Sequence, residues 1–409
     1  MAGTAAYLAD RVFPRVPVRQ WVLSFPHALR YRLAYDASLV TDVLGIFTKT
    51  IFAFLTRRAR EFGATEQAQS GAVTFIQRFD SALGLNLHLH MLVIDGVYAA
   101  DKEGRPHFQV LLAPETEEIQ RLAGRLAERI TKFLGRRGLG PESDPQESDP
   151  LSRDQPAMAA IYVASVLGRV ALGPNAGRRV KRTGDQVDPE TMEGLVSPRC
   201  ASVSGFSLHA NTAVHAEDRA RLERLIGYCA RPAVAIERLD ALQDGRVRYR
   251  FKKPWRDGTT HVVFEPLEFL EKLAALVPAP KAHLVRYHGV LAPAARWRPY
   301  IVPSVTVSES AGVVAVPAIG SDSAFEAEQD TYLPPAPPCR RNYLWVELMK
   351  RVWDLDVLEC PRCRARMRII AAIRSESAAE KILISLGLPS RAPPVTPARR
   401  QLSAEVEPF

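Results

Sequence analysis

The sequence predicts an α+β fold, in which a sheet is flanked by helices, with helical additions and a small C-terminal module. Two patterns indicate it: strand-like apolar runs joined by a short turn-rich connection, and longer segments whose apolar residues recur every three or four positions. The composition agrees, because 47% hydrophobic and 24% charged residues are ordinary for a globular chain and exclude a disordered or fibrous one. For 409 residues we expect two or three domains.

The elements follow from these patterns in chain order. A strand is expected at 18–25, after Pro17, and a long helix at 38–55, where the apolar spacing is helical. Residues 72–79 and 87–95 are strand-like on either side of a turn-rich connection. The same criteria predict four further elements: helices at 115–134, 218–239 and 266–276, and a hairpin-like region at 246–265.

Proline-rich and polar stretches divide the chain into six predicted segments. They are the N-terminal part of the core at 1–135, a flexible linker or insertion at 136–156, the rest of the core at 157–319, a proline-rich linker at 320–340, a small basic module with a Cys-x-x-Cys motif at 341–388, and a disordered tail at 389–409.

Charge and cysteine content narrow the class of protein. The chain has 54 Lys and Arg against 45 Asp and Glu, a net charge of +9, which is compatible with a nucleic-acid partner without establishing one. No run of about 18 apolar residues occurs, and the first residues lack the apolar segment of a signal peptide. Five cysteines, an odd number, disfavour a disulfide scaffold and indicate a reducing cytoplasm.

Two histidines, His88 and His90, lie two residues apart in a strand-like run. Strand alternation puts both imidazoles on one face, opposite the apolar side chains between and beside them. Neutral imidazoles on a rigid strand suit a divalent metal, whereas the alternative is two ordinary hydrogen-bonding histidines at a sheet edge. A third metal ligand is left open among Gln77, Asp80, Asn86 and a residue of the helix around Tyr228.

Tyr228 lies on a predicted amphipathic helix, at the edge of its apolar stripe. A phenol with a pKa of about 10 is a poor nucleophile, and a flanking guanidinium such as Arg231, or a metal-bound phosphate, would make its attack feasible. The alternative is a core tyrosine. Tyr31 and Tyr35 are spaced by four and would share a helix face, but their surroundings indicate a packing helix, so we interpret them as structural.

Basic residues alternate with apolar ones from residue 246 onward, so a strand here would present a phosphate-binding stripe over a buried face. A solvated strand face is the alternative. Trp255 follows and would stack on an unpaired base. The residues predicted to bind DNA are Arg246, Arg248, Arg250, Lys252, Lys253, Trp255 and Arg231.

Cys360 and Cys363 form half of a Zn²⁺ site. Structural zinc needs four ligands, and Cys339 is the only other cysteine nearby in the sequence. We therefore do not expect a zinc site to be completed within this chain.

Taken in order, these blocks resemble the rolling-circle insertion-sequence transposases of the HUH superfamily, a family of two-tyrosine transposases. The resemblance covers roughly residues 1–390. It rests on the His-x-His block at 77–98, extended by the blocks at 205–210, 225–232, 286–293 and 357–363.

The resemblance implies a DNA strand-transfer enzyme with an antiparallel sheet flanked by helices. His88 and His90 would hold Mg²⁺ or Mn²⁺, and Tyr228 would attack the scissile phosphate to give a 5′-phosphotyrosine link and a free 3′-hydroxyl. The substrate would be single-stranded or hairpin DNA at the ends of the element. We expect no membrane partner and a location in the bacterial cytoplasm, at the nucleoid.

The sequence departs from the family pattern in two ways. Arg224 stands four residues from Tyr228, where two-tyrosine members carry their other tyrosine, so the chain resembles a single-tyrosine branch. Family members also begin with a cysteine-rich zinc-binding module, whereas the first cysteine here is Cys200, so we expect a chain truncated at its N-terminus. Two alternatives to the transposase follow: an inactive DNA-binding remnant, and a metal-dependent hydrolase that uses water as its nucleophile.

Overall fold

The computed structural model describes residues 2–64, 67–139, 149–184, 198–252, 254–255, 258–278, 280, 282–303, 343–368, 373 and 375–387. It divides the chain into two units, 1–342 and 343–409, which are described separately. The predicted linker at 320–340 and the tail at 389–409 lie outside the described residues, as do residues 140–148 of the predicted insertion.

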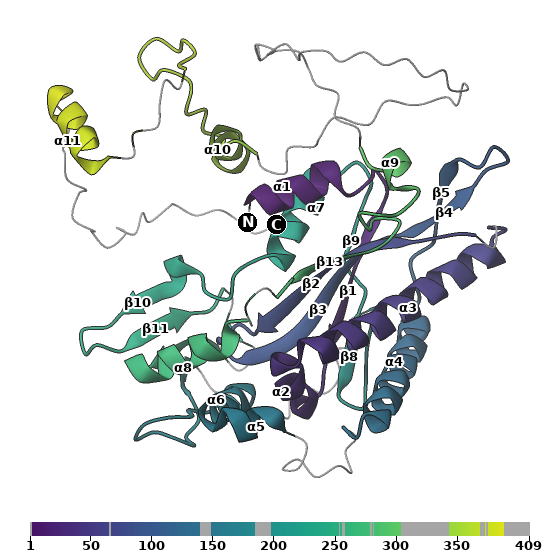
Figure 1. The fold of residues 1–409 in the computed structure, drawn as a ribbon, viewed down its shortest axis with the longest axis horizontal. Helices are drawn as coiled ribbons and strands as arrows, with labels where there is room; N and C mark the ends of the chain where they lie inside the picture. Colours follow the sequence, from purple (N-terminus) through teal and green to yellow (C-terminus); the bar gives the residue numbers. More distant parts are fainter. Residues whose placement is uncertain are drawn as a thin grey trace, which may run out of the picture. The chain divides into compact units, whose positions relative to one another are not determined.

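The larger sheet of the described residues has seven strands and forms the centre of the first unit (Figure 1). Its order is β13-β2-β3-β1-β8-β7, with β9 paired to β1, and each pairing that the structure describes in it is antiparallel. The strands are β1 (Val18–Ser24), β2 (Gly71–Phe79), β3 (Leu85–Ile94), β7 (Cys200–Val203), β8 (Phe206–His209), β9 (Ala213–Val214) and β13 (Val285–Gly289). The predicted α+β class with an antiparallel sheet is confirmed.

Helices cover both faces of this sheet. Leu87, Leu89 and Met91 of β3 pack in one hydrophobic cluster with α3 (Ala37–Glu61) and α4 (Thr116–Arg136). The opposite face packs in a second cluster with α1 (Ala2–Arg11) and α7 (Arg219–Cys229). The side chains of β3 therefore alternate between the two helical layers: Leu87, Leu89 and Met91 face α3 and α4, and Leu92 and Ile94 face α1 and α7.

The long helix α3 is a core element. Asp36 caps it by accepting a hydrogen bond from the backbone N–H of Leu39, as an N-cap aspartate does. By length and composition alone α3 could cross a membrane, but 56% of its most apolar window is buried inside the protein. Helix α2 (His27–Tyr35) precedes it, and the rings of Tyr31 and Tyr35 pack edge to face, 5.2 Å apart between centroids, as expected for structural tyrosines.

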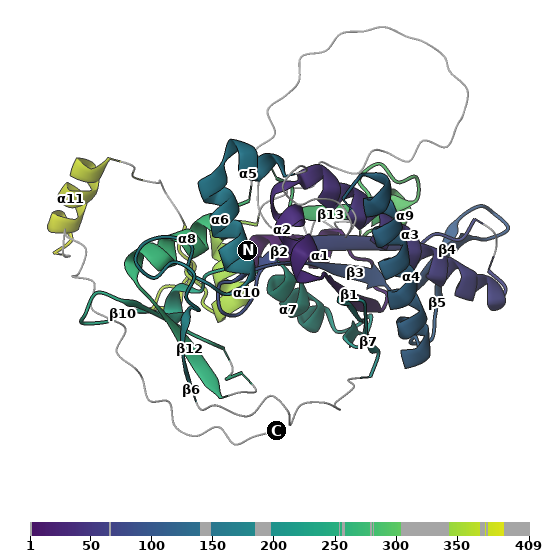
Figure 2. The same cartoon turned by 90° about the horizontal axis from the view of Figure 1, so that it is seen from below.

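A smaller four-stranded sheet lies beside helix α8 in both views (Figures 1 and 2). Its order is β10-β11-β12-β6, and it shares a third hydrophobic cluster with the helices around it. The elements are α5 (Pro150–Asp154), α6 (Pro156–Val166), β6 (Lys181–Gly184), β10 (Leu239–Ala241), β11 (Val247–Arg250), β12 (Thr259–Phe264) and α8 (Pro266–Leu276). Helix α5 occupies part of the predicted linker, because Asp149 caps it and proline takes its first position.

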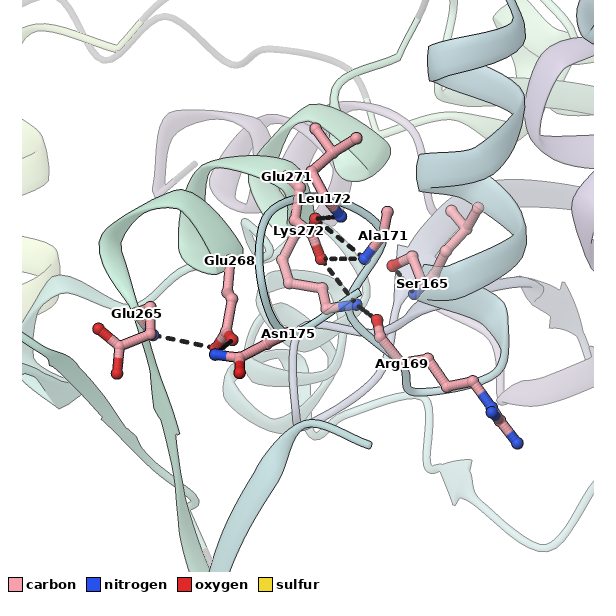
Figure 3. A network of polar contacts seen from close by, with 10 residues as sticks. Ser165, Arg169, Ala171, Leu172, Asn175, Glu265, Glu268, Glu271 and Lys272 are labelled. Atoms are coloured by element: carbon pink, nitrogen blue, oxygen red, sulfur yellow. Dashed lines mark hydrogen bonds and ion pairs between the residues drawn. The ribbon is translucent and has the colours of Figure 1, made fainter. Parts of the chain in front are cut away.

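Buried charges on α8 hold the loop that follows α6 (Figure 3). The Glu271 carboxylate accepts hydrogen bonds from the backbone N–H groups of Ala171 and Leu172, and Lys272 donates to the carbonyl of Arg169. Glu268 accepts from the side chain of Asn175. These contacts satisfy charges that would be costly if buried alone, so they fix the 169–175 loop against α8.

Most predicted elements are confirmed, including the strands at 18–25, 72–79 and 87–95 and the hairpin at 246–265. The helix predicted at 218–239 is present from Arg219, but its predicted end is wrong, because α7 ends at Cys229. Pro232 lacks a backbone N–H and disfavours helical geometry in the residue before it, and the chain continues into the short helix Ile236–Arg238 and then β10.

The remaining elements belong to both units. In the first unit they are β4 (Gly96–Ala100), β5 (Pro106–Val110) and α9 (Arg298–Ile301), and in the second unit α10 (Trp345–Trp353) and α11 (Glu376–Ser385). Between α10 and α11, Cys360 and Cys363 lie in a turn that is closed by a bridge between Glu359 and Arg366.

Candidate functional site

Four polar side chains gather on the α7 face of the larger sheet. In the ladder between β2 and β3, His88 is paired with Gln77. In the ladder between β1 and β3, Gln20 is paired with Leu92, whose side chain projects to the same face of the sheet as that of His90. Paired residues of an antiparallel ladder project to the same side. Gln20, Gln77, His88 and His90 therefore share the face on which α7 packs, as the strand pattern predicts for the two histidines.

The two imidazoles and Tyr228 form a row of rings. The centroids of the His88 and His90 rings are 4.8 Å apart, and those of His90 and Tyr228 are 5.7 Å apart, with the two ring planes at 90°. His90 is only 4% exposed, whereas Tyr228 is 44% exposed. The phenol thus lies between a buried imidazole and solvent, where a large substrate has access to it.

The position of Tyr228 is set by the way in which α7 begins and ends. Asp218 caps the start by accepting from the N–H of Arg221, and Leu222, Ile226 and Cys229 are buried against the sheet. At the end, Gln77 Nε2 donates to the carbonyls of Tyr228 and Cys229 at 3.2 and 2.7 Å. The last carbonyls of a helix have no partner within it, so this amide ties the tyrosine to β2.

Gln77 Oε1 and His90 Nε2, on this face of the sheet, are buried and have no hydrogen-bond partner among the described residues. His88 Nδ1 lies 2.8 Å from the carbonyl oxygen of Asn86, which can only accept, so Nδ1 carries the proton and Nε2 keeps its lone pair. Leaving a buried polar atom unpaired costs about 1–3 kcal/mol. Such atoms on one sheet face indicate a site for a ligand that would pair with them.

Gln20 contacts both His90 and the tyrosine helix. Its Nε2 lies 2.9 Å from His90 Nδ1 and 3.2 Å from the sulfur of Cys229, the residue after Tyr228. Burial raises the pKa of the Cys229 thiol to about 12, so the thiol stays protonated and can also act as a donor. Gln20 therefore links β1, the histidine strand and α7 through one side chain.

Both imidazoles are neutral at pH 7. Burial, followed by the charges of His88 and Arg231, lowers the pKa of His90 to about 3, and burial also lowers the pKa of His88. A neutral imidazole is the form that binds a metal ion. Both imidazoles therefore have the charge state that metal binding requires across the physiological range.

A guanidinium lies against the phenol. The Arg231 Cζ atom is 4.7 Å from the centroid of the Tyr228 ring and 5.4 Å from that of Phe79. Its buried Nε has no partner among the residues described. Arg231 therefore supplies a positive charge beside Tyr228.

The residues predicted to bind DNA fall into two groups. Arg231, Lys252 and Trp255 line one cavity together with Tyr228. Three arginines instead have acidic partners: Arg246 pairs with Asp244, and both Arg248 and Arg250 pair with Asp240. Lys253 lies outside the described residues.

The Cys-x-x-Cys motif belongs to the second unit. Cys360 and Cys363 are free cysteines, and no third His, Cys, Asp or Glu in the described part of the chain joins them as a metal-binding group. Cys339 lies outside the described residues.

The sequence analysis missed Gln20 as a member of the site. Its signal was a polar residue inside a strand whose neighbours are apolar, and it is 6% exposed. Arg19 beside it has the same character, but it forms a buried ion pair with Asp95 at 2.6 Å. A buried polar side chain in a strand can therefore be assigned to a site only once the strand pairing shows which residues share its face of the sheet.

Comparison with known proteins identifies the family. A family model described as "Putative transposase" matches residues 71–298. Neither the curated proteins nor the solved structures that were compared include a match to the chain. The matched region contains His88, His90, Gln77 and Tyr228 and exceeds half of the 409 residues, so the chain belongs to this transposase family.

Proposed function

We propose that this transposase nicks and rejoins single-stranded or hairpin DNA at the ends of its element, through a 5′-phosphotyrosine intermediate on Tyr228. Membership of the family makes the protein a DNA-processing enzyme of transposition. The observation that carries the finer proposal is the half-exposed phenol of Tyr228, 5.7 Å from the buried imidazole of His90. A nucleophile for a phosphodiester needs this combination of access for a long substrate and a fixed position.

The donor atoms fit a divalent cation, for which His88, His90 and Gln77 are the proposed ligands. Two of the atoms required, His90 Nε2 and Gln77 Oε1, are buried without a partner in the described structure. When bound, Mg²⁺ or Mn²⁺ would polarise an oxygen of the scissile phosphate. Imidazole suits Mn²⁺ better than Mg²⁺, so Mn²⁺ is the better probe.

One change of hydrogen bonding accompanies this proposal. With Gln20 Nε2 facing His90 Nδ1, the proton of the neutral ring lies on Nε2. A half-turn of the Gln20 amide brings its oxygen to the ring, so that Nδ1–H and the Cys229 thiol both donate to it. The lone pair of Nε2 then becomes available as a ligand.

The chemical step is an in-line displacement. The Tyr228 oxygen forms a bond to phosphorus, the bond from phosphorus to the 3′-oxygen breaks, the phenolic proton leaves to water, and the 3′-oxygen takes up a proton. Arg231 neutralises part of the charge on the phosphate oxygens. Because the link keeps a phosphodiester, a 3′-hydroxyl can reverse the reaction without ATP.

A single tyrosine restricts the order of events. Arg224 lies one helical turn before Tyr228, so α7 offers one phenol to the site. Each phosphotyrosine bond must therefore be resolved before the same residue can nick again. We place this activity in the bacterial cytoplasm, at the nucleoid.

The test is a labelling experiment with Mn²⁺. A pool of single-stranded oligonucleotides is labelled at the 3′ end or at the 5′ end, incubated with the protein and separated on a denaturing protein gel. The proposal predicts that only the 3′ label migrates with the protein, because the 5′-phosphate side stays attached to it. Tyr228→Phe should abolish this band, and Tyr300→Phe, at a residue 68% exposed in the same unit, should keep it.

The same reactions, run in parallel on the denaturing gel for cleavage and on a native gel for DNA binding, separate the rival functions. Strand cleavage that survives Tyr228→Phe would assign the attack to water and contradict the proposal. Retained DNA binding without cleavage in the wild-type protein would identify an inactive remnant.

A further inference from the structure

A cavity of about 470 Å³ adjoins Tyr228. Its lining comes from the end of α7 and the segment after it, from the end of β2 and the turn that follows, and from β11 with the residues after it. Its lining residues are Phe79, Asp80, Ser81, Tyr228, Arg231, Pro232, Ala233, Ala235, Arg238, Tyr249, Lys252, Pro254 and Trp255. This volume falls in the range of about 300–1,000 Å³ that small-molecule sites occupy, so one nucleotide can fit.

One wall of the cavity is aromatic and fixed in place. Trp255 stacks on Phe251, with centroids 4.9 Å apart and ring planes 20° from parallel. The indole Nε1 donates to Ser81 Oγ at 2.8 Å. The position of the indole is therefore fixed both by ring stacking and by a hydrogen bond from its N–H. Because the side chain is already ordered, little conformational entropy is lost when a base stacks on it.

The polar lining is mostly cationic. The lining residues include three basic side chains, Arg231, Arg238 and Lys252, and a single carboxylate, Asp80. One oxygen of Asp80 already accepts from the backbone N–H groups of Ala82 and Gly84, so this acid is engaged in its own turn. Positive charge beside an aromatic wall matches the two parts of a nucleotide, its phosphate and its base.

A second cavity of similar size lacks the combination of aromatic and basic residues that lines the cavity beside Tyr228. It measures about 460 Å³ and is lined mainly by small and aliphatic residues of α6 and of the loop after it, with Arg169 as its one basic residue. No aromatic side chain is among its lining residues. Cavity volume alone therefore does not account for the aromatic and cationic combination next to Tyr228.

We infer that the cavity beside Tyr228 binds one unpaired nucleotide of the DNA strand, with its base stacked at Trp255 and its phosphate near Arg231, Arg238 and Lys252. This inference rests on the proposed function, because the nucleotide would be a neighbour of the scissile phosphate. It adds that the strand must be locally unpaired at this position, since a stacked base in a duplex cannot enter.

The test compares two ligands of equal length and charge in the absence of divalent metal: a dT₁₂ oligonucleotide and a 12-unit abasic backbone. Stacking contributes about 1–3 kcal/mol per base, so wild-type protein should bind dT₁₂ about 5- to 150-fold more tightly. Trp255→Ala should lower this affinity ratio at least fivefold, and Trp255→Phe should restore most of it. Arg238→Gln should weaken both ligands equally, and Trp345→Ala in the second unit should change neither.

An unchanged affinity ratio in Trp255→Ala would overturn the inference. If Trp255→Ala fails to fold, tryptophan fluorescence decides: dT₁₂ should quench wild-type emission more than the abasic backbone does, and this difference should vanish in Trp255→Phe. A difference that persists in Trp255→Phe would also overturn it. Binding without metal requires no cleavage, so a failure of the nicking proposal leaves this result readable.

Discussion

His288, which is half-buried, and His90, which is buried, lie on opposite faces of the same sheet and have different surroundings. His288 of β13 pairs with Ala72, on the face of α3 and α4, and its Nε2 lies 3.1 Å from the hydroxyl of Thr74. His90, on the α7 face, has an Nε2 without a partner in the described structure. The first histidine is satisfied and structural, whereas the second keeps a ligand position open.

The same contrast extends to the two faces as a whole. Around His288 the sheet packs aliphatic residues against α3 and α4, and burial there stabilises the fold. Around His90 the buried positions of the sheet include the polar residues Gln20 and Gln77, which contact His90 and the end of α7. Two atoms on this face, Gln77 Oε1 and His90 Nε2, have no partner in the described structure. We therefore expect mutations on the face of α3 and α4 to change the free energy of unfolding. Mutations on the α7 face should instead change metal binding and DNA cleavage.

The largest effect should come from the apolar face. Leu89 is 1% exposed and packs in the cluster with α3 and α4, so Leu89→Ala leaves a cavity and should lower the free energy of unfolding by about 2–5 kcal/mol. Urea unfolding followed by circular dichroism measures it. A loss below about 1 kcal/mol would show that this face is not the main core.

His288 should make stability depend on pH. Burial, and then the charge of Arg286, lowers the pKa of His288 to about 4, below its ordinary value near 6.5. The unfolded chain therefore binds this proton first, so the contribution is complete above pH 6.5 and is lost as pH falls toward 4. The full loss is about 3 kcal/mol. Denaturant titrations between pH 7 and 4 should show this slope, and His288→Gln should reduce it, the remaining slope coming from His88 and His90, whose pKa values are also lowered.

Gln20 should act on metal binding through His90. Removal of a side chain that orients a ligating histidine typically costs 10- to 100-fold in metal affinity, so Gln20→Ala should weaken Mn²⁺ binding by this factor. Gln20→Glu, which keeps an acceptor for the Nδ1 proton, should recover most of it. Calorimetric Mn²⁺ titration is the readout, and equal affinity in all three proteins would rule out this positioning role.

The smallest effect on stability is expected at His90 itself. His90→Leu removes a buried nitrogen that has no partner in the described structure, which offsets the lost contact with Gln20. The free energy of unfolding should change by less than about 1 kcal/mol, while Mn²⁺ binding is lost. Urea unfolding and calorimetry on the same sample measure both, and a large destabilisation would make His90 structural like His288.

The sequence predicts the parts of this site that depend on local periodicity. Alternation along 87–95 predicts the common face of His88 and His90, and helical spacing predicts Tyr228 at the edge of an apolar stripe. Neither pattern depends on which strands are neighbours in the sheet, so each can be predicted from the sequence of its own strand or helix alone.

The parts that depend on strand order could not be predicted in the same way. Gln20 reaches His90 because β1, seventy positions away in the chain, pairs with β3. Gln77 holds α7 because β2 pairs with β3 on its other edge, and the cavity forms because α7 ends before Pro232. These are outcomes of long-range pairing, which no single segment encodes.

The central claim, that Tyr228 becomes covalently attached to DNA, is tested most directly by mass spectrometry of the nicking reaction. After nuclease digestion, trypsin should release the peptide 225–238, because Pro232 protects the bond after Arg231. We predict this peptide with a nucleotide phosphate on Tyr228. Cleaved DNA with an unmodified 225–238 peptide, or with the nucleotide on Tyr31 or Tyr35, would contradict the account.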